Sequence, residues 1–246
     1  MFQTYNLATE QSNYSTQQQG VNLSQTSFDK DTEFITKIDF TQIEEMDPSL
    51  YDGHRVIFDS ELAVEVKLID DEDEGAFESL KLKVMILGDE RQPINIKMEM
   101  TSESDIFFLY KNITNEDKFR VIQEQQALSL EFTDFSAMLM KILQNCQKPQ
   151  TTFITIFTLD NEEKKGYLEF YQDTEFRRVE MLRIEFEEAD EDTIKNHITY
   201  RLTSIRQKTT LMQERIKDVM AIVEEKNPML VSEIYKATPS LYVQQR

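Results

Sequence analysis

The chain has 246 residues, of which 46 are acidic and 27 basic, and its formal net charge at pH 7 is -19. An acidic chain repels phosphate backbones and anionic lipid headgroups, so binding to nucleic acid or to a membrane surface is disfavoured. The 39% of hydrophobic residues, with 16 Phe and 9 Tyr, suffice for one core and exclude a wholly disordered chain.

The first part of the chain is polar. Residues 1–30 are rich in Gln, Ser, Thr and Asn, and offer too little apolar surface to offset the entropy lost on ordering. Residues 31–53 are ambiguous, because Phe34-Ile35 and Ile38–Phe40 are apolar groups of a size to dock on a domain. We therefore expect residues 1–53 to form a largely disordered extension.

A β-rich domain follows. Apolar and polar residues alternate with the two-residue period of half-buried strands. The strands are expected at 62–68, 80–86, 94–100, 153–159, 166–172 and 179–186. The acidic run 70–75 is expected to be the loop between the first two strands, and 161–165 a turn.

Two helices are expected inside this domain, at 115–126 and 134–146, with a short strand-like segment at 128–132 between them. Glu116 and Asp117 suit the first turn of the first helix, where the helix dipole favours acids. The predicted fold is therefore α+β: a barrel-like or sandwich-like β head, residues 54–190, with an inserted helical hairpin.

After the head, apolar residues recur at intervals of four and three, which is the a/d seam of a coiled coil. Thr209 is its one polar position, and the apolar ones are Ile198, Leu202, Ile205, Met212, Ile216, Val219 and Val223. We expect residues 191–227 to form one short dimerising helix that ends at Pro228. Residues 228–246 are expected to be a flexible tail.

The sequence gives no positive support for catalysis, a cofactor or a metal. There is no Gly-rich phosphate loop, and the acidic run from Asp70 imitates an EF-hand but places Lys81 where a bidentate carboxylate is required. The two histidines, His54 and His197, lie far in sequence from Cys146, the single cysteine, so a Cys/His dyad is disfavoured. We expect that the protein is not an enzyme.

The compartment is expected to be the cytoplasm. One cysteine excludes an intramolecular disulfide framework, the first residues lack the basic and apolar regions of a signal peptide, and nothing approaches the roughly 18 apolar residues of a membrane span. The helix of the seam also carries a local basic surface, which includes Arg201, Arg206, Lys208, Arg215 and Lys217. They are interpreted either as the flanking charge of a coiled coil or as a contact for an acidic partner.

One stretch resembles a known family. The residues that carry the resemblance are Ile106–Tyr110, Asn115–Asp117, Phe119, Gln125–Leu128, Glu131-Phe132, Phe135 and Leu143–Cys146. In order and spacing this string is similar to the conserved core of the spindle assembly abnormal protein 6 family, the centriolar cartwheel proteins. The resemblance extends from Ile57 to Gln213, about two thirds of the chain.

The resemblance implies a β-rich head with a helical hairpin and a parallel coiled-coil dimer. Heads of neighbouring dimers in this family bind through an aromatic or aliphatic residue on a loop between two late strands. The matching residue is Phe176, with Thr174, Glu175 and Arg177 beside it in the implied head–head interface. A polar turn is also where a large ring is expected to be exposed.

The implied function is a non-catalytic, self-assembling cytoskeletal scaffold at a centriole, a basal body or the base of a cilium. Its implied partners are copies of itself and other centriolar or basal-body proteins, with no nucleic acid and no membrane. Ala127 departs from the family, which usually has Gly there. Because the seam ends at Pro228, the chain resembles the short paralogues of this family, which keep the head and lack the long spoke.

Two other interpretations remain open from the sequence. One is a head-plus-coiled-coil adaptor of another class, such as a DNA end-joining scaffold, against which the net charge and the string from Phe107 to Cys146 argue. The other is a ligand-binding β domain, which a deep polar pocket with convergent side chains would favour.

Overall fold

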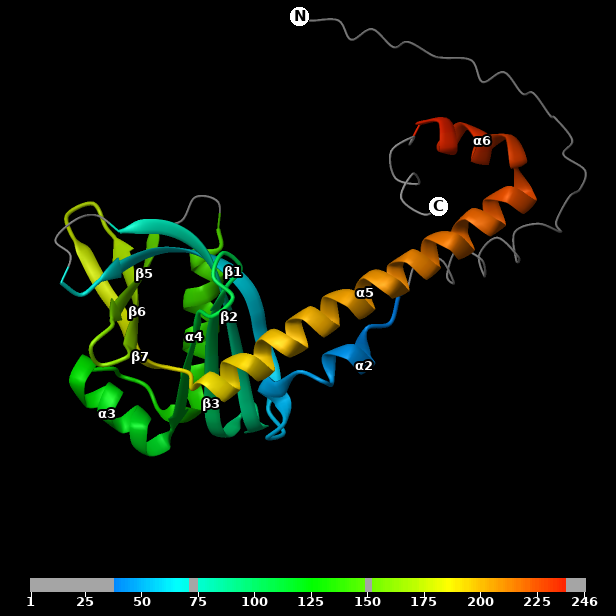
Figure 1. Ribbon diagram of the computed structural model, residues 1–246. Helices are drawn as coiled ribbons and strands as arrows, with labels where there is room; N and C mark the ends of the chain where they lie inside the picture. The colour runs from blue at the N-terminus through cyan, green and yellow to red at the C-terminus, as the bar shows by residue number, and fades with distance from the viewer. Residues whose placement is uncertain (1–37, 71–74, 149–151, 238–246) are drawn as a thin grey trace, which may run out of the picture. The chain divides into compact units, whose positions relative to one another are not determined.

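The computed structural model describes residues 38–70, 75–148 and 152–237 (Figure 1). Within these residues, seven strands close a barrel in the order β1-β2-β3-β4-β7-β6-β5. The strands are β1 (Arg55–Leu68), β2 (Ala76–Asp89), β3 (Gln92–Ser102), β4 (Leu109–Asn115), β5 (Phe153–Asp160), β6 (Lys165–Asp173) and β7 (Arg178–Glu188). Neighbouring strands are antiparallel except β1 and β5, which pair in parallel. The α+β prediction is confirmed, and its head is barrel-like.

The alternating apolar and polar residues of the strands lie on the inner and outer faces of the barrel wall. On β2, Leu80, Leu82 and Val84 are fully buried in the core, whereas Lys81 and Lys83 between them face outward and are only partly buried. The barrel closes through two short pairings, because β4 and β7 pair only at Tyr110 and Lys111, and β1 and β5 pair over four residues, Glu65–Leu68. The outward face therefore carries the residues available for other contacts.

Two consecutive helices, α3 (Glu116–Gln126) and α4 (Phe132–Cys146), connect β4 to β5. The Asn115 side chain caps α3 by accepting a hydrogen bond from the Lys118 N–H at 2.9 Å. Phe119 of α3 packs against Phe135 of α4, with ring centroids 4.8 Å apart. The apolar face of α4 is buried in the same core as the strands.

The prediction of a strand-like segment at 128–132 is wrong. Residues 128–131 are a loop, and Phe132 is the first residue of α4. Ala127 ends α3 in the left-handed conformation, with φ 50° and ψ 43°, and turns the chain. The ring of Phe132 then lies 5.7 Å from that of Phe119. The packing of Phe132 against Phe119 thus outweighs the strand-like pattern of residues 128–132.

The prediction that residues 1–53 form a largely disordered extension is also wrong for its last part. Residues 1–37 lie outside the described part, but α2 (Thr41–Glu44) and the 3₁₀ helix η1 (Pro48–Leu50) are ordered elements. Ile43, Asp47 and Ser49 are all buried. Because two of these three are polar, hydrophobic periodicity could not identify this segment as part of the domain.

The chain then forms α5 (Glu191–Lys226) and α6 (Pro228–Ala237). The expected flexible tail is therefore wrong for residues 228–237, while residues 238–246 lie outside the described part. Pro228 ends α5 but is tolerated at the first position of α6, where its missing N–H has no helical partner to lose. None of the helices described is both long and apolar enough to cross a membrane.

The chain divides into two units. Phe40–Thr210 is one compact unit, which contains the barrel, α2 to α4 and the first part of α5, and the residues from Leu211 onward belong to the other. The sites below are described within the first unit, apart from the apolar positions further along α5.

Candidate functional site

The loop that joins β6 to β7 holds Phe176. The two strands pair up to Asp173 opposite Arg178, and Thr174–Arg177 form the tip. The Thr174 N–H and hydroxyl both donate to the carbonyl of Arg177, at 3.0 and 2.6 Å, and the Arg177 N–H donates to the Thr174 hydroxyl oxygen at 3.2 Å. Three hydrogen bonds thus close the tip across Glu175 and Phe176.

Phe176 is 89% exposed, at the tip of this closed loop. Thr174, Glu175 and Arg177 are exposed around it. A large ring held in water by a rigid turn is pre-organised for burial against another surface, because little further entropy is lost when it binds. The structure therefore gathers all four residues predicted for the head–head interface on one exposed tip.

Charge at the base of the same loop is internally balanced. The Arg178 guanidinium donates to the Asp173 carboxylate at 3.0 Å, and this hydrogen bond raises the pKa of Arg178. Arg177 and Glu175 remain exposed at the tip. The aromatic ring is thus flanked by one cation and one anion.

The helix α5 begins at a capped turn. The Asp190 carboxylate accepts hydrogen bonds from the Thr193 hydroxyl at 2.7 Å and its N–H at 2.9 Å, and Lys111 of β4 pairs with it at 3.1 Å. These hydrogen bonds, first those of Thr193, hold the pKa of Asp190 well below its usual range. The first turn of α5 is thereby tied to the barrel.

The apolar seam of α5 is largely uncovered by the residues that the structure describes. Leu202, Ile205, Met212 and Ile216 are exposed, and Ile198, Val219 and Val223 are half-buried. An apolar stripe at heptad spacing that its own chain leaves in water is typical of a helix that pairs with another helix.

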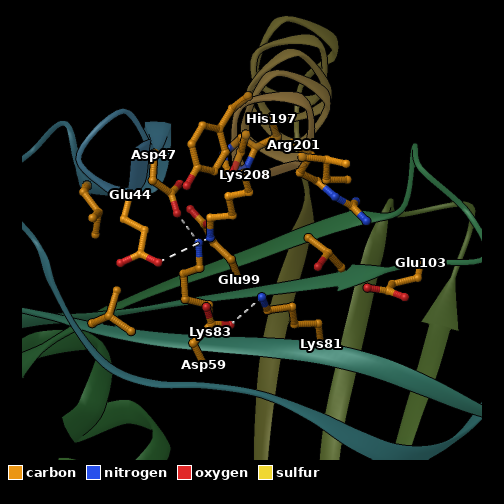
Figure 2. Close-up of a pocket in the computed structure, with 16 residues that line it drawn as sticks. Glu44, Asp47, Asp59, Lys81, Lys83, Glu99, Glu103, His197, Arg201 and Lys208 are labelled. Carbon is orange, nitrogen blue, oxygen red and sulfur yellow. Dashed lines mark hydrogen bonds and ion pairs between the residues drawn. The ribbon is translucent and has the colours of Figure 1, made fainter. Parts of the chain in front are cut away.

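A different face of α5 lies over a hollow of about 500 Å³ on the outer wall of β2 and β3 (Figure 2). His197, Arg201 and Lys208 descend from α5, and Glu44 and Asp47 come from the N-terminal segment beside it. This region contains buried charges that the sequence analysis did not identify.

Ser49 is at the centre of these charges and is fully buried. Its hydroxyl donates to Glu99 at 2.5 Å, its carbonyl accepts from the ammonium of Lys97 at 3.2 Å, and its N–H donates to Asp47 at 2.9 Å. Asp47 in turn pairs with Lys83, and Lys97 pairs with Glu99 at 3.0 Å. Two acids and two bases are thus neutralised around one serine.

The pKa values follow from this arrangement. Burial of Asp47 opposes its ionisation, but the charge and hydrogen bond of Lys83 outweigh burial, so the pKa of Asp47 is lowered. Burial lowers the pKa of His197, against the opposing charges of Glu99 and Asp47. Burial, with Asp47 nearby, raises the pKa of Tyr200 to about 12.

Sequence patterns give little signal for this network. Lys83, Lys97 and Glu99 stand at outward positions of strands, where charges are ordinary. The local signal is Asp47 before Pro48 and Ser49, which is a typical start of a helical turn, because the Asp side chain caps the N–H two residues later. That signal predicts the turn but not what the turn packs against.

Arg201 and Lys208 of α5 make contacts within the chain. Arg201 donates to the carbonyl of Ser102 at 3.1 Å, and Lys208 pairs with Glu44 at 3.3 Å. For these two residues the structure favours an intramolecular role over a contact with an acidic partner.

Cys146 and His54 lie in separate places and have partners of their own. Cys146 accepts a hydrogen bond from the Thr155 hydroxyl at 3.5 Å, and burial raises the pKa of its thiol. His54 hydrogen-bonds Asn95 at 2.8 Å. Within the described residues, no group of three or more His, Cys, Asp or Glu side chains is arranged to hold a metal ion.

Comparison with known proteins identifies relatives of the barrel. Residues 56–186 match the family model described as the centriolar protein SAS N-terminal domain. Among curated proteins, the spindle assembly abnormal protein 6 homologues of Danio rerio and Gallus gallus are each 19% identical over 169 residues. The match covers 66% of this chain but only 27% and 26% of those proteins, so the chain spans about a quarter of their length.

Solved structures share the fold at similarly low identity. An N-terminal fragment of Leishmania SAS-6 with parts of its coiled coil, a phenylalanine-to-glutamate mutant, is 18% identical with a TM-score of 0.62, covering 72% of this chain and 99% of that one. The N-terminal coiled-coil dimer of C. elegans SAS-6 is 18% identical with a TM-score of 0.52, covering 67% of this chain and 98% of that one.

Proposed function

Because the chain belongs to the family defined by the N-terminal domain of the centriolar SAS proteins, we propose that it is a non-catalytic scaffold that assembles with copies of itself. The observation that carries this proposal is the exposed ring of Phe176 on a closed loop. The proposed location is the cytoskeleton, at a centriole, a basal body or the base of a cilium.

The first proposed contact joins one head to the next through Phe176. Burying a Phe side chain is worth about 1.5–3 kcal/mol, and an aromatic anchor can carry about 2 kcal/mol or more of an interface. A single anchor in a small contact corresponds to weak, roughly micromolar binding of about -8 kcal/mol. Such a contact forms and dissociates readily until a second contact reinforces it.

The second proposed contact is a dimer through α5. The seam residues Leu202, Ile205, Met212 and Ile216 are exposed in the single chain, and burial against a second copy of the helix would remove them from water. The C. elegans SAS-6 fragment with the same fold is a coiled-coil dimer. A dimer presents two heads, so each weak head contact is reinforced by the effective concentration of the other.

The net charge of -19 opposes both contacts, because every copy repels the next. Arg177 places positive charge beside Phe176 and reduces this repulsion locally, whereas the charge of Arg178 is balanced by Asp173. Added salt screens the repulsion between copies and also weakens any ion pair that Arg177 makes across the contact.

The test is sedimentation velocity over a concentration series for the wild type, Phe176→Glu and Phe77→Glu. Phe77 is the matched control, since it is also an exposed phenylalanine, 75% exposed, but stands on β2 and not on the β6–β7 loop. We expect the wild type and Phe77→Glu to form species larger than a dimer as concentration rises. Phe176→Glu is expected to stop at the dimer.

If Phe176→Glu assembles as the wild type does, Phe176 is not an assembly contact. If both variants lose assembly equally, general acidification of the surface is the cause and not the loop.

A further inference from the structure

We infer that residues 40–50 are a clamp that fixes the direction in which the first part of α5, up to Thr210, leaves the barrel. This inference concerns the compact unit Phe40–Thr210 alone. Its consequence for assembly rests on the proposed function, whereas the orientation of α5 does not.

The clamp is fastened to the barrel through η1. Ser49 is fully buried and bonds Glu99 and Lys97 of β3, and Asp47 pairs with Lys83 of β2. Charged groups buried in this way must keep their partners, because an unpaired buried charge is far more costly than the pair. The segment is therefore held at a defined place on the outer wall of β2 and β3.

The clamp holds α5 from the other side. Glu44 of α2 pairs with Lys208 at 3.3 Å, and the same ammonium lies 5.3 Å from the centre of the Phe40 ring, within reach of a cation–π contact. Figure 1 shows α2 alongside α5, and Figure 2 shows Lys208 beside Glu44 above the strands. The segment thus bridges the barrel and the helix.

The position of Lys208 along α5 explains why this bridge restricts the direction of the helix. The barrel itself holds α5 near its start, through Lys111 with Asp190 and through the Ser102 carbonyl with Arg201. Lys208 lies 18 residues beyond Asp190, which is roughly 27 Å along a helix. A contact far from the start of a helix restricts the helix direction more than a contact at its start does. The contacts of Glu44 and Phe40 with Lys208 therefore control the tilt of α5 relative to the barrel.

The clamp and the seam use adjacent faces of α5, and Ile205 of the seam lies at the edge of the hollow. His197, Arg201, Ser204 and Lys208 recur at helical spacing on the clamp face, and His197 and Ser204 are buried there. Seam positions follow each of the first three by one residue, which is a rotation of roughly 100° about the helix axis. The head can therefore grip α5 while the seam remains open to a second helix.

In a self-assembling scaffold, the angle between the head and the dimerising helix decides whether successive head contacts curve toward closure or continue as an open helix. The clamp would set that angle within each chain. It gives the N-terminal segment a role in the geometry of assembly that is separate from the contact made by Phe176.

The test measures the angle directly by double electron–electron resonance, in the full chain. Spin labels are attached to cysteines at Asn161, in the turn between β5 and β6, and at Thr210 on α5, both exposed, in a Cys146→Ser background. Phe176→Glu is included so that the heads do not associate, and labelled chains are diluted in unlabelled protein to suppress distances between copies. The result is thus independent of whether the proposed head contact exists.

The variants are Glu44→Lys, the matched control Glu45→Lys, and the charge exchange Glu44→Lys with Lys208→Glu. Glu45 is the adjacent exposed acid, so its variant carries the same change of net charge. We expect a single narrow distance distribution for the parent and for Glu45→Lys, a broadened or shifted one for Glu44→Lys, and recovery in the charge exchange.

A further variant, Phe40→Ala with Glu44→Lys, removes both contacts to Lys208 and should broaden the distribution most. Thermal unfolding followed by circular dichroism verifies that every variant compared has a folded barrel. If folded Phe40→Ala with Glu44→Lys gives the parent distribution, the start of α5 alone sets its direction and the clamp is overturned.

Discussion

Gly166 of β6 lies directly against the ring of Phe157 on the neighbouring strand β5. A Cβ built on Gly166 would stand 2.3 Å from Cζ of Phe157, which is far inside van der Waals contact. The ring in turn meets Tyr110 and Phe186, with centroids 5.4 and 5.9 Å apart. The inner wall of the barrel lacks a side chain at Gly166 because an aromatic ring from the next strand occupies that volume.

We therefore expect Gly166→Ala to destabilise the head, by about 1–3 kcal/mol, since overpacking a full core forces shifts of side chains and backbone. Urea unfolding followed by circular dichroism gives the free energy of unfolding. Adding Phe157→Leu should recover part of the loss made by Gly166→Ala. Equal unfolding midpoints for Gly166→Ala and the wild type would refute the packing argument.

Replacing Ala127 by glycine should stabilise the protein. Ala127 ends α3 with φ 50°, a left-handed conformation that costs a residue with a Cβ roughly 1–2 kcal/mol and costs glycine little. We expect Ala127→Gly to raise the free energy of unfolding by up to about 1 kcal/mol, because the flexible unfolded chain offsets part of the gain. The control is Ala137→Gly, an exposed site within α4, which should lower it by about 1 kcal/mol. A loss of stability in both variants would contradict the assignment.

The ion pair of Asp47 with Lys83 should contribute more to the free energy of unfolding than the ion pair of Asp59 with Lys81, which lies on the same barrel wall. Asp47 is buried, and Asp47→Asn would leave the Lys83 ammonium without its counter-charge, at a cost of about 3 kcal/mol or more. Asp59 and Lys81 are about one third exposed or more, so Asp59→Asn should cost no more than about 1 kcal/mol. Chemical unfolding of both variants at neutral pH makes the comparison, and equal losses would exclude a special role for burial.

Stability should also fall in mild acid because of His197. Burial lowers its pKa in the folded protein below the ordinary 6.5, with Lys83 and Lys97 acting in the same direction and Glu99 and Asp47 opposing. As the pH falls through 6.5, the unfolded chain takes up a proton that the folded chain does not, so unfolding is favoured. This contribution to stability is complete above pH 6.5 and is lost as the pH falls toward the lowered folded value.

The measurement is the free energy of unfolding at about pH 7.5 and about pH 5.5, a range in which histidine titrates and ordinary carboxylates largely do not. His197→Gln should lose less stability than the wild type between these two conditions. An identical loss in both proteins would show that another group is responsible.

The seam of α5 should be separable from the head. We expect Leu202→Asp with Ile216→Asp to abolish the dimer, because two carboxylates would be buried in an apolar interface. Both residues are exposed in the single chain, so the unfolding of the barrel should not change. Thr203→Asp with Thr210→Asp adds the same two charges away from the seam and should remain dimeric. Sedimentation equilibrium measures the mass, and a dimer that survives Leu202→Asp with Ile216→Asp would disprove the seam.

Local periodicity in the sequence is enough to predict several elements of this protein. The alternation of Leu80, Leu82 and Val84 predicts a strand wherever its partners lie, because successive side chains of a strand must point to opposite faces. The four-and-three spacing from Ile198 to Val223 likewise predicts one helix with an apolar stripe. The exposure of Phe176 was expected because a ring within a polar turn has no apolar neighbours in sequence.

The buried charges around Ser49 and the contacts of Lys208 could not be predicted from the sequence, because they join residues far apart in the chain. Ser49 and Glu99 are 50 positions apart, and Glu44 and Lys208 are 164 apart. In the sequence these four residues are ordinary polar residues. They come together only because the N-terminal segment packs on the outer face of β2 and β3 and contacts α5. Burial then raises the energetic cost of every unpaired charge, and this cost favours an ordered segment 40–50, which the sequence alone left ambiguous.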